Sequence, residues 1–364
     1  MRHKIALSIA VILIVCIAVG LFFWFKKEKL PERQLEAAVN NQSLFPTAQM
    51  NRVASQIGER VNVEPAINIG SGDNKPSTPQ PSKELEYLKP FADMPIRVLN
   101  VVQPDFSQDP RLEYQRRLKA VHALDARLTS EEIKVLMAFL RSPVEADTSL
   151  DPLSINSIKN EVMDLLIQQE PLPPDLGKEL ASMSADPSLD SGIRDYSVQH
   201  FAPYFKARWG SGEVDTESPD YQEIMRGYDQ AVRMTNTSLQ GTALIGLYAL
   251  SEEYKSIDRQ NVEKLAFQMA NDPGNFVNTR VTAIQLCGRM GLKEILPTAR
   301  IEAQSGETVQ LRMSAIATLG DLGDKNDAAL VEALALENDA RIQTAAKSSL
   351  KRLTHRLGAI PKDL

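Results

Sequence analysis

The sequence predicts an all-α fold of stacked antiparallel helix pairs, and three observations lead to this fold class. A pattern in residues 279–291 returns 32 positions later in residues 311–323. Self-similarity at a period of about 30 to 45 residues is typical of stacked helical repeats. Weaker copies occur on both sides of this doubled segment, and the helix-favouring residues alanine, leucine and glutamate are frequent in the second half of the chain.

The doubled segment carries the same residue types at the same spacing in both copies. The shared positions are Arg280, Ala283, Gly288 and Gly291 in the first copy, and Arg312, Ala315, Gly320 and Gly323 in the second. The alanine and an apolar residue four positions later lie on one face of a helix. We expect the alanine to permit close approach of a neighbouring helix, and the apolar residue to fill the core.

Looser copies extend the array in both directions. All copies together begin at residues 116, 158, 193, 239, 279, 311 and 342, and the last one contains Ala346 and Leu350. A second segment with helical spacing of apolar residues follows most copies, at residues 130–140, 262–269, 295–301 and 328–336. Each unit is therefore predicted to be a helix, a turn and a helix, with loops of variable length between units.

This pattern resembles HEAT repeats, particularly the short bacterial type related to phycobilisome-lyase repeats. The resemblance rests on Arg280, Ala283 and Gly288-x-x-Gly291 and on their counterparts in the second copy, and it is strongest over residues 276–352. It implies a right-handed α-solenoid, which we assign to residues 96–358. It implies little about activity, because one fold hosts unrelated functions.

The chain begins with a short basic segment, residues 1–4, followed by an uncharged apolar run of 21 residues at residues 5–25. A transmembrane helix needs about 20 such residues, so we expect a single-pass signal anchor. Two alternatives stay open. One is a cleaved signal peptide, because Ala18-Val19-Gly20 resembles a small-x-small cleavage site, and the other is a lipoprotein signal that ends at Cys16.

The segment between this run and the repeats, residues 26–95, is expected to be a flexible linker that contains proline and serine. Basic residues flank both ends of the apolar run, so the positive-inside rule leaves its orientation open. The short basic start resembles a signal anchor, which places the repeat domain on the extracytoplasmic, periplasmic side. Residues 95–102 are predicted to be a strand or an extended lead-in, and residues 359–364 a C-terminal tail.

The composition argues against several classes of function. A net charge of -6 disfavours a general nucleic-acid binder, which usually carries a basic field. The four histidines are dispersed and the two cysteines lie far apart in the chain, so we expect neither a metal site nor a disulfide framework. The sequence contains no G-x-S-x-G, P-loop or G-x-G-x-x-G motif. We therefore expect no cofactor and no catalytic residue.

Two groups of basic residues have a structural and a functional interpretation. Arg194, Arg280 and Arg312 occupy the second position of the pattern, where they either bind acidic partners or form an internal ladder to acidic or carbonyl groups of the next repeat. We favour the ladder. The last predicted helix suits a polar terminal face and the helix dipole, or forms a patch for a membrane surface or an acidic partner. Its basic residues are Lys347, Lys351, Arg352, His355 and Arg356.

These features favour a membrane-anchored scaffold that binds another protein or a peptide through the surface of its solenoid, without catalysis. The alternative is a cofactor-handling or lyase-like HEAT enzyme, which requires a deep pocket. The densest aromatic group in the repeat region is the place to look for such a pocket or for a binding site. It lies in an irregular segment that contains Tyr204, Trp209, Tyr221 and Tyr228.

Overall fold

The computed structural model describes residues 96–107, 109–124, 127–144, 147, 149–235 and 237–358. The predictions for residues 1–4, 5–25, 26–95 and 359–364 lie outside these ranges. Throughout the described residues the regular structure is helical, and strands are absent from them. None of the helices in this part of the chain is long and apolar enough to cross a membrane.

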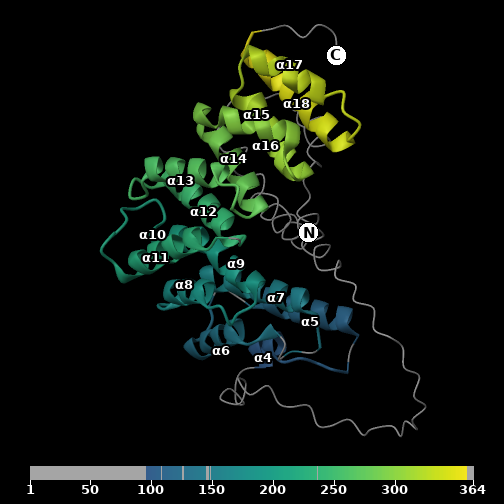
Figure 1. Cartoon of the computed structure of the whole chain (residues 1–364). Helices are drawn as coiled ribbons and strands as arrows, with labels where there is room; N and C mark the ends of the chain where they lie inside the picture. Colours follow the sequence, from purple (N-terminus) through teal and green to yellow (C-terminus); the bar gives the residue numbers. More distant parts are fainter. Residues whose placement is uncertain are drawn as a thin grey trace, which may run out of the picture. The chain divides into compact units, whose positions relative to one another are not determined.

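The helices alternate between two sets that we call first and second helices (Figure 1). The first helices contain the copies of the pattern. They are α5 (Pro110–Ala123), α7 (Pro152–Ile167), α9 (Ser191–Gln199), α12 (Leu239–Glu253), α14 (Val277–Met290), α16 (Val309–Leu322) and α18 (Ala340–Arg356). The second helices are α6 (Ser130–Arg141), α8 (Leu176–Ala185), α11 (Pro219–Arg233), α13 (Arg259–Asn271), α15 (Leu296–Ser305) and α17 (Lys325–Leu334).

Three further elements complete the described part of the array. They are α4 (Ile96–Val102), α10 (Phe201–Trp209) and the 3-10 turn η3 (Lys293–Ile295). The strand or extended conformation predicted for residues 95–102 is wrong over residues 96–102, which form α4. Val98, Val101 and Val102 of α4 are fully buried. Burial against α5 and α6 thus outweighs the preference of β-branched residues for strands.

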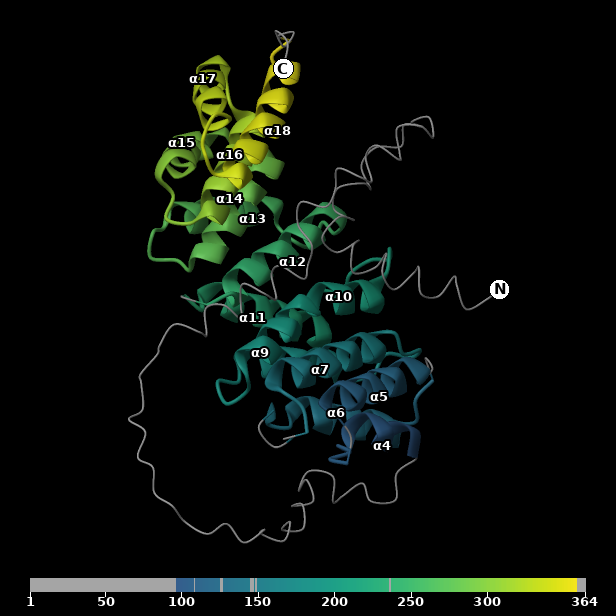
Figure 2. The same ribbon diagram turned by 90° about the vertical axis from the view of Figure 1, so that its right-hand side faces the viewer.

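The first helices stack side by side along the array. Figures 1 and 2 both show α12, α14, α16 and α18 following one another, and each contacts the next. Second helices pack against the first helix of the following unit, as α15 does against α16 and α17 against α18. Figure 2 shows α15 and α17 on one side of α16 and α18. A single helix pair cannot bury its apolar stripe alone, so each unit depends on its neighbours.

Side-chain caps begin several of these helices where the sequence supplies a short polar residue. Thr129 forms a capping box with Glu132 at the start of α6, and Asp324 forms one with Asp327 at the start of α17. Such caps bond backbone N–H groups that have no partner in the first turn of a helix. Residues 324–327 thus act as the turn and cap before α17.

The copy that begins at residue 193 differs from the pattern, in which the fifth and ninth residues, here Ser197 and Phe201, share one face of a single helix. In the structure α9 ends at Gln199, and Phe201 begins the separate helix α10. The sequence contains the physical reason. Pro203 has no backbone N–H, so the helical bond to the carbonyl of Gln199 cannot form.

Matching glycines of the doubled segment play different roles at the helix ends. Gly291 ends α14 with φ 79°, a left-handed conformation that glycine adopts without a steric penalty. Gly323 ends α16 with φ −55°, which any residue adopts. A Cβ atom at Gly323 would instead meet the carbonyl oxygen of Leu319. Gly291 is therefore required for its backbone conformation, whereas Gly323 is required because a side chain there would clash with the Leu319 carbonyl oxygen.

The earlier glycines of the doubled segment allow first helices to approach each other. A Cβ atom added to Gly288 would lie 3.0 Å from the Thr318 Oγ1 of α16. At Gly320 it would lie 2.7 Å from the Cβ and 2.9 Å from the Cα of Ser349 in α18. In both cases the tenth residue of one copy faces the eighth residue of the next. Ala283, Ala315 and Ala346 are fully buried in the same helices.

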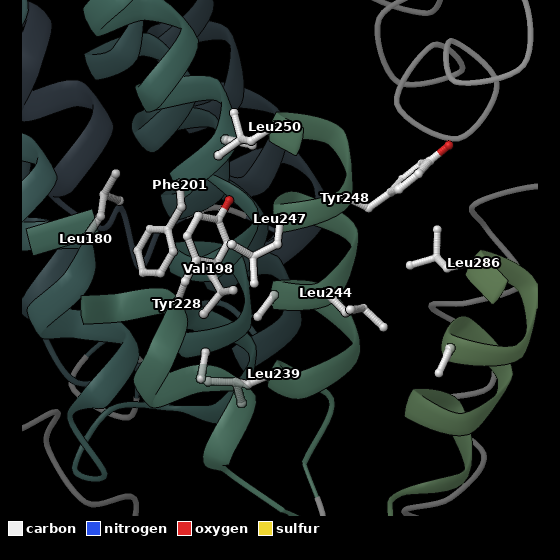
Figure 3. Packing of buried hydrophobic residues seen from close by; sticks show 14 of the residues in the cluster. Leu180, Val198, Phe201, Tyr228, Leu239, Leu244, Leu247, Tyr248, Leu250 and Leu286 are labelled. Atoms are coloured by element: carbon white, nitrogen blue, oxygen red, sulfur yellow. The ribbon is translucent and has the colours of Figure 1, made fainter. Parts of the chain in front are cut away.

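The core is continuous from one unit to the next. Figure 3 shows its middle part, where side chains of α8, α9, α10, α11 and α12 meet, and where Tyr248 projects from α12 toward α14. Leu286 is a buried residue of α14 in the same view. The α12–α14 contact thus has large side chains at the tenth and eighth positions, in contrast to the glycine and hydroxyl residues of the two later contacts.

Candidate functional site

The irregular segment around residues 204–228 was the first candidate for a site, and its aromatic residues divide into two groups. Tyr204 and Tyr228 each expose only 1% of their surface. Trp209 and Tyr221 are partly buried and pack against the core. The structure therefore places two of the four candidates where a ligand outside the core does not reach them.

Ring contacts between α10 and α11 hold this group together. Phe205 lies 4.4 Å from Trp209 and 6.1 Å from Tyr221, measured between ring centroids. Tyr228 packs edge-on against Phe201 of α10, with centroids 5.0 Å apart (Figure 3). Such edge-to-face pairs are a stable arrangement of aromatic rings. The structure thus brings Trp209 and Tyr221 together around Phe205, whereas Tyr228 packs against a different ring, that of Phe201.

The sequence analysis missed Tyr254, which follows α12 and completes this cluster. Its ring centroid lies 4.8 Å from that of Phe205, and its hydroxyl donates to the carbonyl oxygen of Gly210 at 2.6 Å. Tyr221 likewise donates to the carbonyl oxygen of Ser256 at 3.2 Å. These bonds join the end of α10 and the start of α11 to the segment after α12. They hold the α10–α11 connection against the segment that follows α12.

The phenols of the two buried tyrosines stay protonated at neutral pH. Burial, with a smaller contribution from the charge of Asp220, raises the pKa of Tyr204 to about 12. Burial alone raises the pKa of Tyr228 well above its ordinary value. The Tyr228 hydroxyl has no hydrogen-bond partner among the described residues and points at Gly246. Neither phenol has the pKa of a general acid or base that works near pH 7.

A surface recess of about 380 Å³ lies beside this cluster, on the connection between α10 and α11. It is lined by Glu213, Val214, Asp215 and Thr216, and by none of the four candidate aromatic residues. Glu213 and Asp215 are exposed to solvent. In the described part of the chain, no three His, Cys, Asp or Glu side chains are placed to hold a metal ion. The recess thus offers two solvated carboxylates and no further chemistry.

The second position of the pattern has a structural role that extends beyond the arginines. Residues of this position on five first helices donate side-chain hydrogen bonds to backbone carbonyls in the last turn of the preceding helix or just after it. The pairs are Arg117 with Val101, Lys159 with Leu140 and Ser142, Arg194 with Ser184, Gln240 with Val232, and Arg312 with Ala303. These carbonyls lack a partner within their own helix, and a cation near them complements the helix dipole.

Carboxylates on the second helix of the same unit, or just after that helix, bind two arginines of this position. Arg280 pairs with Glu302 and, at 3.3 Å, with Glu307, while Arg312 pairs with Glu337 at 2.6 Å. The ladder predicted from the sequence placed both the acidic groups and the carbonyl groups in the next repeat. In the structure the carboxylates do lie ahead in the chain, whereas the carbonyls lie behind. Arg312 therefore joins its own unit to the preceding one.

Arg117 is the most buried member of this row, with none of its surface exposed. It donates to the carboxylate of Asp147 and, at 2.6 Å, to the carbonyl oxygen of Val101. Its guanidinium carbon lies 5.3 Å from the ring centroid of Phe139, and the Lys159 ammonium lies 5.4 Å from the same centroid. These groups form a cation–π and ion-pair cluster inside the array, which explains two buried cations without invoking a ligand.

The histidines at the seventh and eighth positions link first helices to α7. His122 of α5 lies 3.1 Å from a carboxylate oxygen of Glu161. His200 is buried, with Nδ1 2.8 Å from the carbonyl oxygen of Tyr196 and Nε2 3.1 Å from a carboxylate oxygen of Asp164. Both ring nitrogens of His200 thus face acceptors. This geometry gives both histidines a role in helix packing.

Exposed apolar side chains on the second-helix side are the structural feature that suits binding best. Phe267 of α13, Ile301 of α15 and Leu336, just after α17, expose 36%, 63% and 79% of their surface. Binding through the solenoid surface was predicted from the sequence, but these three residues were not singled out. Their signal is an apolar residue outside the buried stripe of its helix, since the buried positions of α15 are Leu296, Ala299 and Ala303.

Polar contacts fix these second helices relative to each other. The hydroxyl of Thr298 in α15 bonds the side-chain oxygen of Asn271 in α13. Arg300 of α15 donates to Asp327 at 2.6 Å and to Asp324 at 3.2 Å, at the start of α17. The surface that carries Phe267, Ile301 and Leu336 is therefore built on helices that are tied together.

Comparison with known proteins adds little to this picture. No protein-family model matches the chain, and a sequence search finds no match among curated proteins. A solved structure of human deoxyhypusine hydroxylase with glycerol is 14% identical over 71% of this chain and 95% of its own, with a TM-score of 0.29. A crystal structure of Kap121p is 12% identical over 71% of this chain and 38% of its own, with a TM-score of 0.33. Likeness at this level carries no argument about function, and the helix pairs themselves define an α-helical repeat protein.

Proposed function

We propose that this chain is a membrane-anchored, HEAT-like scaffold that binds another protein or a peptide through the second-helix side of a right-handed solenoid. The observation that carries the proposal is the exposure of Phe267, Ile301 and Leu336 on successive second-helix units. Exposed apolar side chains that together form one patch on a rigid scaffold are typical of protein interaction sites. The apolar run at residues 5–25 supports the anchor, and the short basic start supports a periplasmic repeat domain.

The buried aromatic cluster supports the scaffold over the enzyme. An enzyme acting at Tyr204 or Tyr228 needs access to their phenols, and both are packed in the core. The recess on the connection between α10 and α11 is lined by other residues and is open to solvent through Glu213 and Asp215. We therefore propose no catalytic role for this segment.

A crosslinking experiment with a matched control tests the proposed surface. Full-length tagged protein is crosslinked in its native cells, captured, and its partners are quantified by mass spectrometry. The test variant replaces Phe267, Ile301 and Leu336 with serine. The control variant replaces three apolar residues exposed on and before the first helices, which are Phe106, Leu112 and Leu153. Substitutions of exposed side chains usually change stability by less than about 0.5 kcal/mol.

We expect partner recovery to fall several-fold in the test variant and to stay unchanged in the control. Equal recovery in both variants, with both still folded by circular dichroism, would remove the second-helix side as the binding surface. A topology reporter fused after Leu364 tests the anchor separately. If the fusion shows activity of a reporter that works only in the cytoplasm, the proposed periplasmic location is contradicted.

A further inference from the structure

Helix α18 carries a stripe of basic side chains that the array does not use. The helix contains six basic residues and no acidic one, in a protein whose net charge is -6. Half of these basic residues bind partners within the chain. Arg341 pairs with Asp339, Arg352 with Asp321, and Arg356 donates to the carbonyl oxygen of Gly323.

The remaining three, Lys347, Lys351 and His355, are four residues apart and exposed. Within the described residues, none of the three has an ion-pair partner. Residues spaced by four lie on nearly one face of a helix, and three of them extend over about 12 Å along its axis. The polar residues Thr344 and Ser348 lie on the same exposed side. A terminal repeat needs a polar outer face, but that need does not require charges of a single sign.

We propose that this stripe of Lys347, Lys351 and His355 binds an acidic segment of a protein partner, with carboxylates spaced about one helical turn apart. The inference deepens the scaffold function proposed above and rests on it. The stripe defines the chemistry of one segment of the partner, which is acidic. The exposed apolar residues of the second-helix side define a separate surface that the partner contacts. Opposite charges on two helices steer association and set its register.

The stripe fits an acidic protein segment better than it fits a membrane or a nucleic acid. Helices that lie on membranes insert apolar side chains, and the apolar residues Leu350 and Leu353 of α18 are buried against the array. Electrostatic lipid binding typically uses clusters of about four to eight lysines or arginines. A general nucleic-acid site needs a basic field larger than one short stripe in an acidic protein.

A defined peptide probe tests the proposal on the full-length protein. The probe is a fluorescein-labelled helical peptide with three glutamates spaced by four, and its control peptide has glutamine at those positions. Binding is measured by fluorescence anisotropy at low and at high sodium chloride. The test variants are Lys347→Glu with Lys351→Glu, and the milder Lys347→Ala with Lys351→Ala. The matched control is Lys178→Glu with Lys264→Glu, which makes the same charge change on exposed sites of α8 and α13.

We expect the glutamate peptide to bind more tightly than the glutamine peptide, and its Kd to rise at least about tenfold in both test variants but not in the control. Equal weakening by the control variant, or no binding of the peptide to the native protein, overturns the proposal. So does competition by monomeric dihexanoyl-phosphatidylglycerol that matches that of unlabelled peptide, since the stripe would then be a lipid site. The serine variant of Phe267, Ile301 and Leu336 should still bind the peptide, so failure of the second-helix surface and failure of the stripe remain distinguishable.

Discussion

The close approach of α16 to α18 at Gly320 predicts how an added methyl group changes stability. An alanine Cβ at this position would lie 2.7 Å from the Cβ and 2.9 Å from the Cα of Ser349. The second distance involves backbone, so a side-chain rotation cannot relieve it. The Gly320→Ala variant therefore forces the two helices apart.

Two opposing effects set the magnitude. Overpacking of a close contact costs about 1–3 kcal/mol, while replacing a glycine inside a helix with alanine gains about 0.5–1 kcal/mol. We expect Gly320→Ala to destabilise the protein by about 1–2 kcal/mol. At Gly288 the nearest atom is the Thr318 hydroxyl oxygen at 3.0 Å and the nearest backbone atom lies at 3.5 Å. The two effects should nearly cancel in Gly288→Ala.

The assay compares urea midpoints by circular dichroism and adds hydrogen exchange of α16 and α18, because neighbouring units of an array unfold in a coupled manner. Gly291→Ala serves as the control for backbone strain. No atom lies within 4 Å of its added Cβ, yet its φ of 79° disfavours alanine. Gly320→Ala should lower the urea midpoint and speed exchange in both helices. A Gly320→Ala variant as stable as the native protein, or less perturbed than Gly288→Ala, would refute the packing argument.

Three more predictions follow from the buried groups. Arg117→Met should cost about 3–5 kcal/mol in a urea titration, since it leaves the Asp147 carboxylate buried without its cation, and Asp147→Asn in the same chain should restore part of the loss. Burial raises the pKa of the Cys287 thiol to about 12, so in a Cys16→Ser variant at pH 8 iodoacetamide should label the unfolded protein but not the native one. Burial also raises the pKa of Tyr204 to about 12. The unfolded chain releases the protons of both groups at lower pH, so the urea midpoint should fall as the pH rises from about 9 toward 12, and a midpoint that stays constant would contradict this linkage.

Local patterns in the chain predicted the helical units but not every boundary. The four-residue spacing of Ala346 and Leu350 is enough to place both on a buried helix face. Thr129 and Asp324 begin helices because a short polar side chain bonds the free N–H groups of the first turn. The break before Phe201 was also readable, since Pro203 removes a helical bond. In contrast, α4 is a helix because its valines are buried, which depends on its neighbours.

The candidate sites depended more strongly on the folded structure. The density of aromatic residues around Tyr204 and Tyr228 marks a segment of the sequence, yet the same density describes a buried cluster as well as an open pocket. Exposure separates these cases, and it is set by residues distant in the chain, such as Tyr254. Leu336 shows the converse, because it exposes 79% of its surface directly after a helix in which Val331 and Leu334 are buried.

By itself, the sequence determined that this protein repeats a helical unit, because helix periodicity, caps and glycine positions act over a few residues. Only the tertiary structure decided what each repeated residue does. Gly291 and Gly323 match in sequence but differ in φ, and Arg280 and Arg312 bind carboxylates ahead in the chain, while Arg312 also bonds the carbonyl of Ala303 behind it. The physical reason is that hydrogen-bond partners, close contacts and exposure arise between units, across separations that a local pattern does not encode.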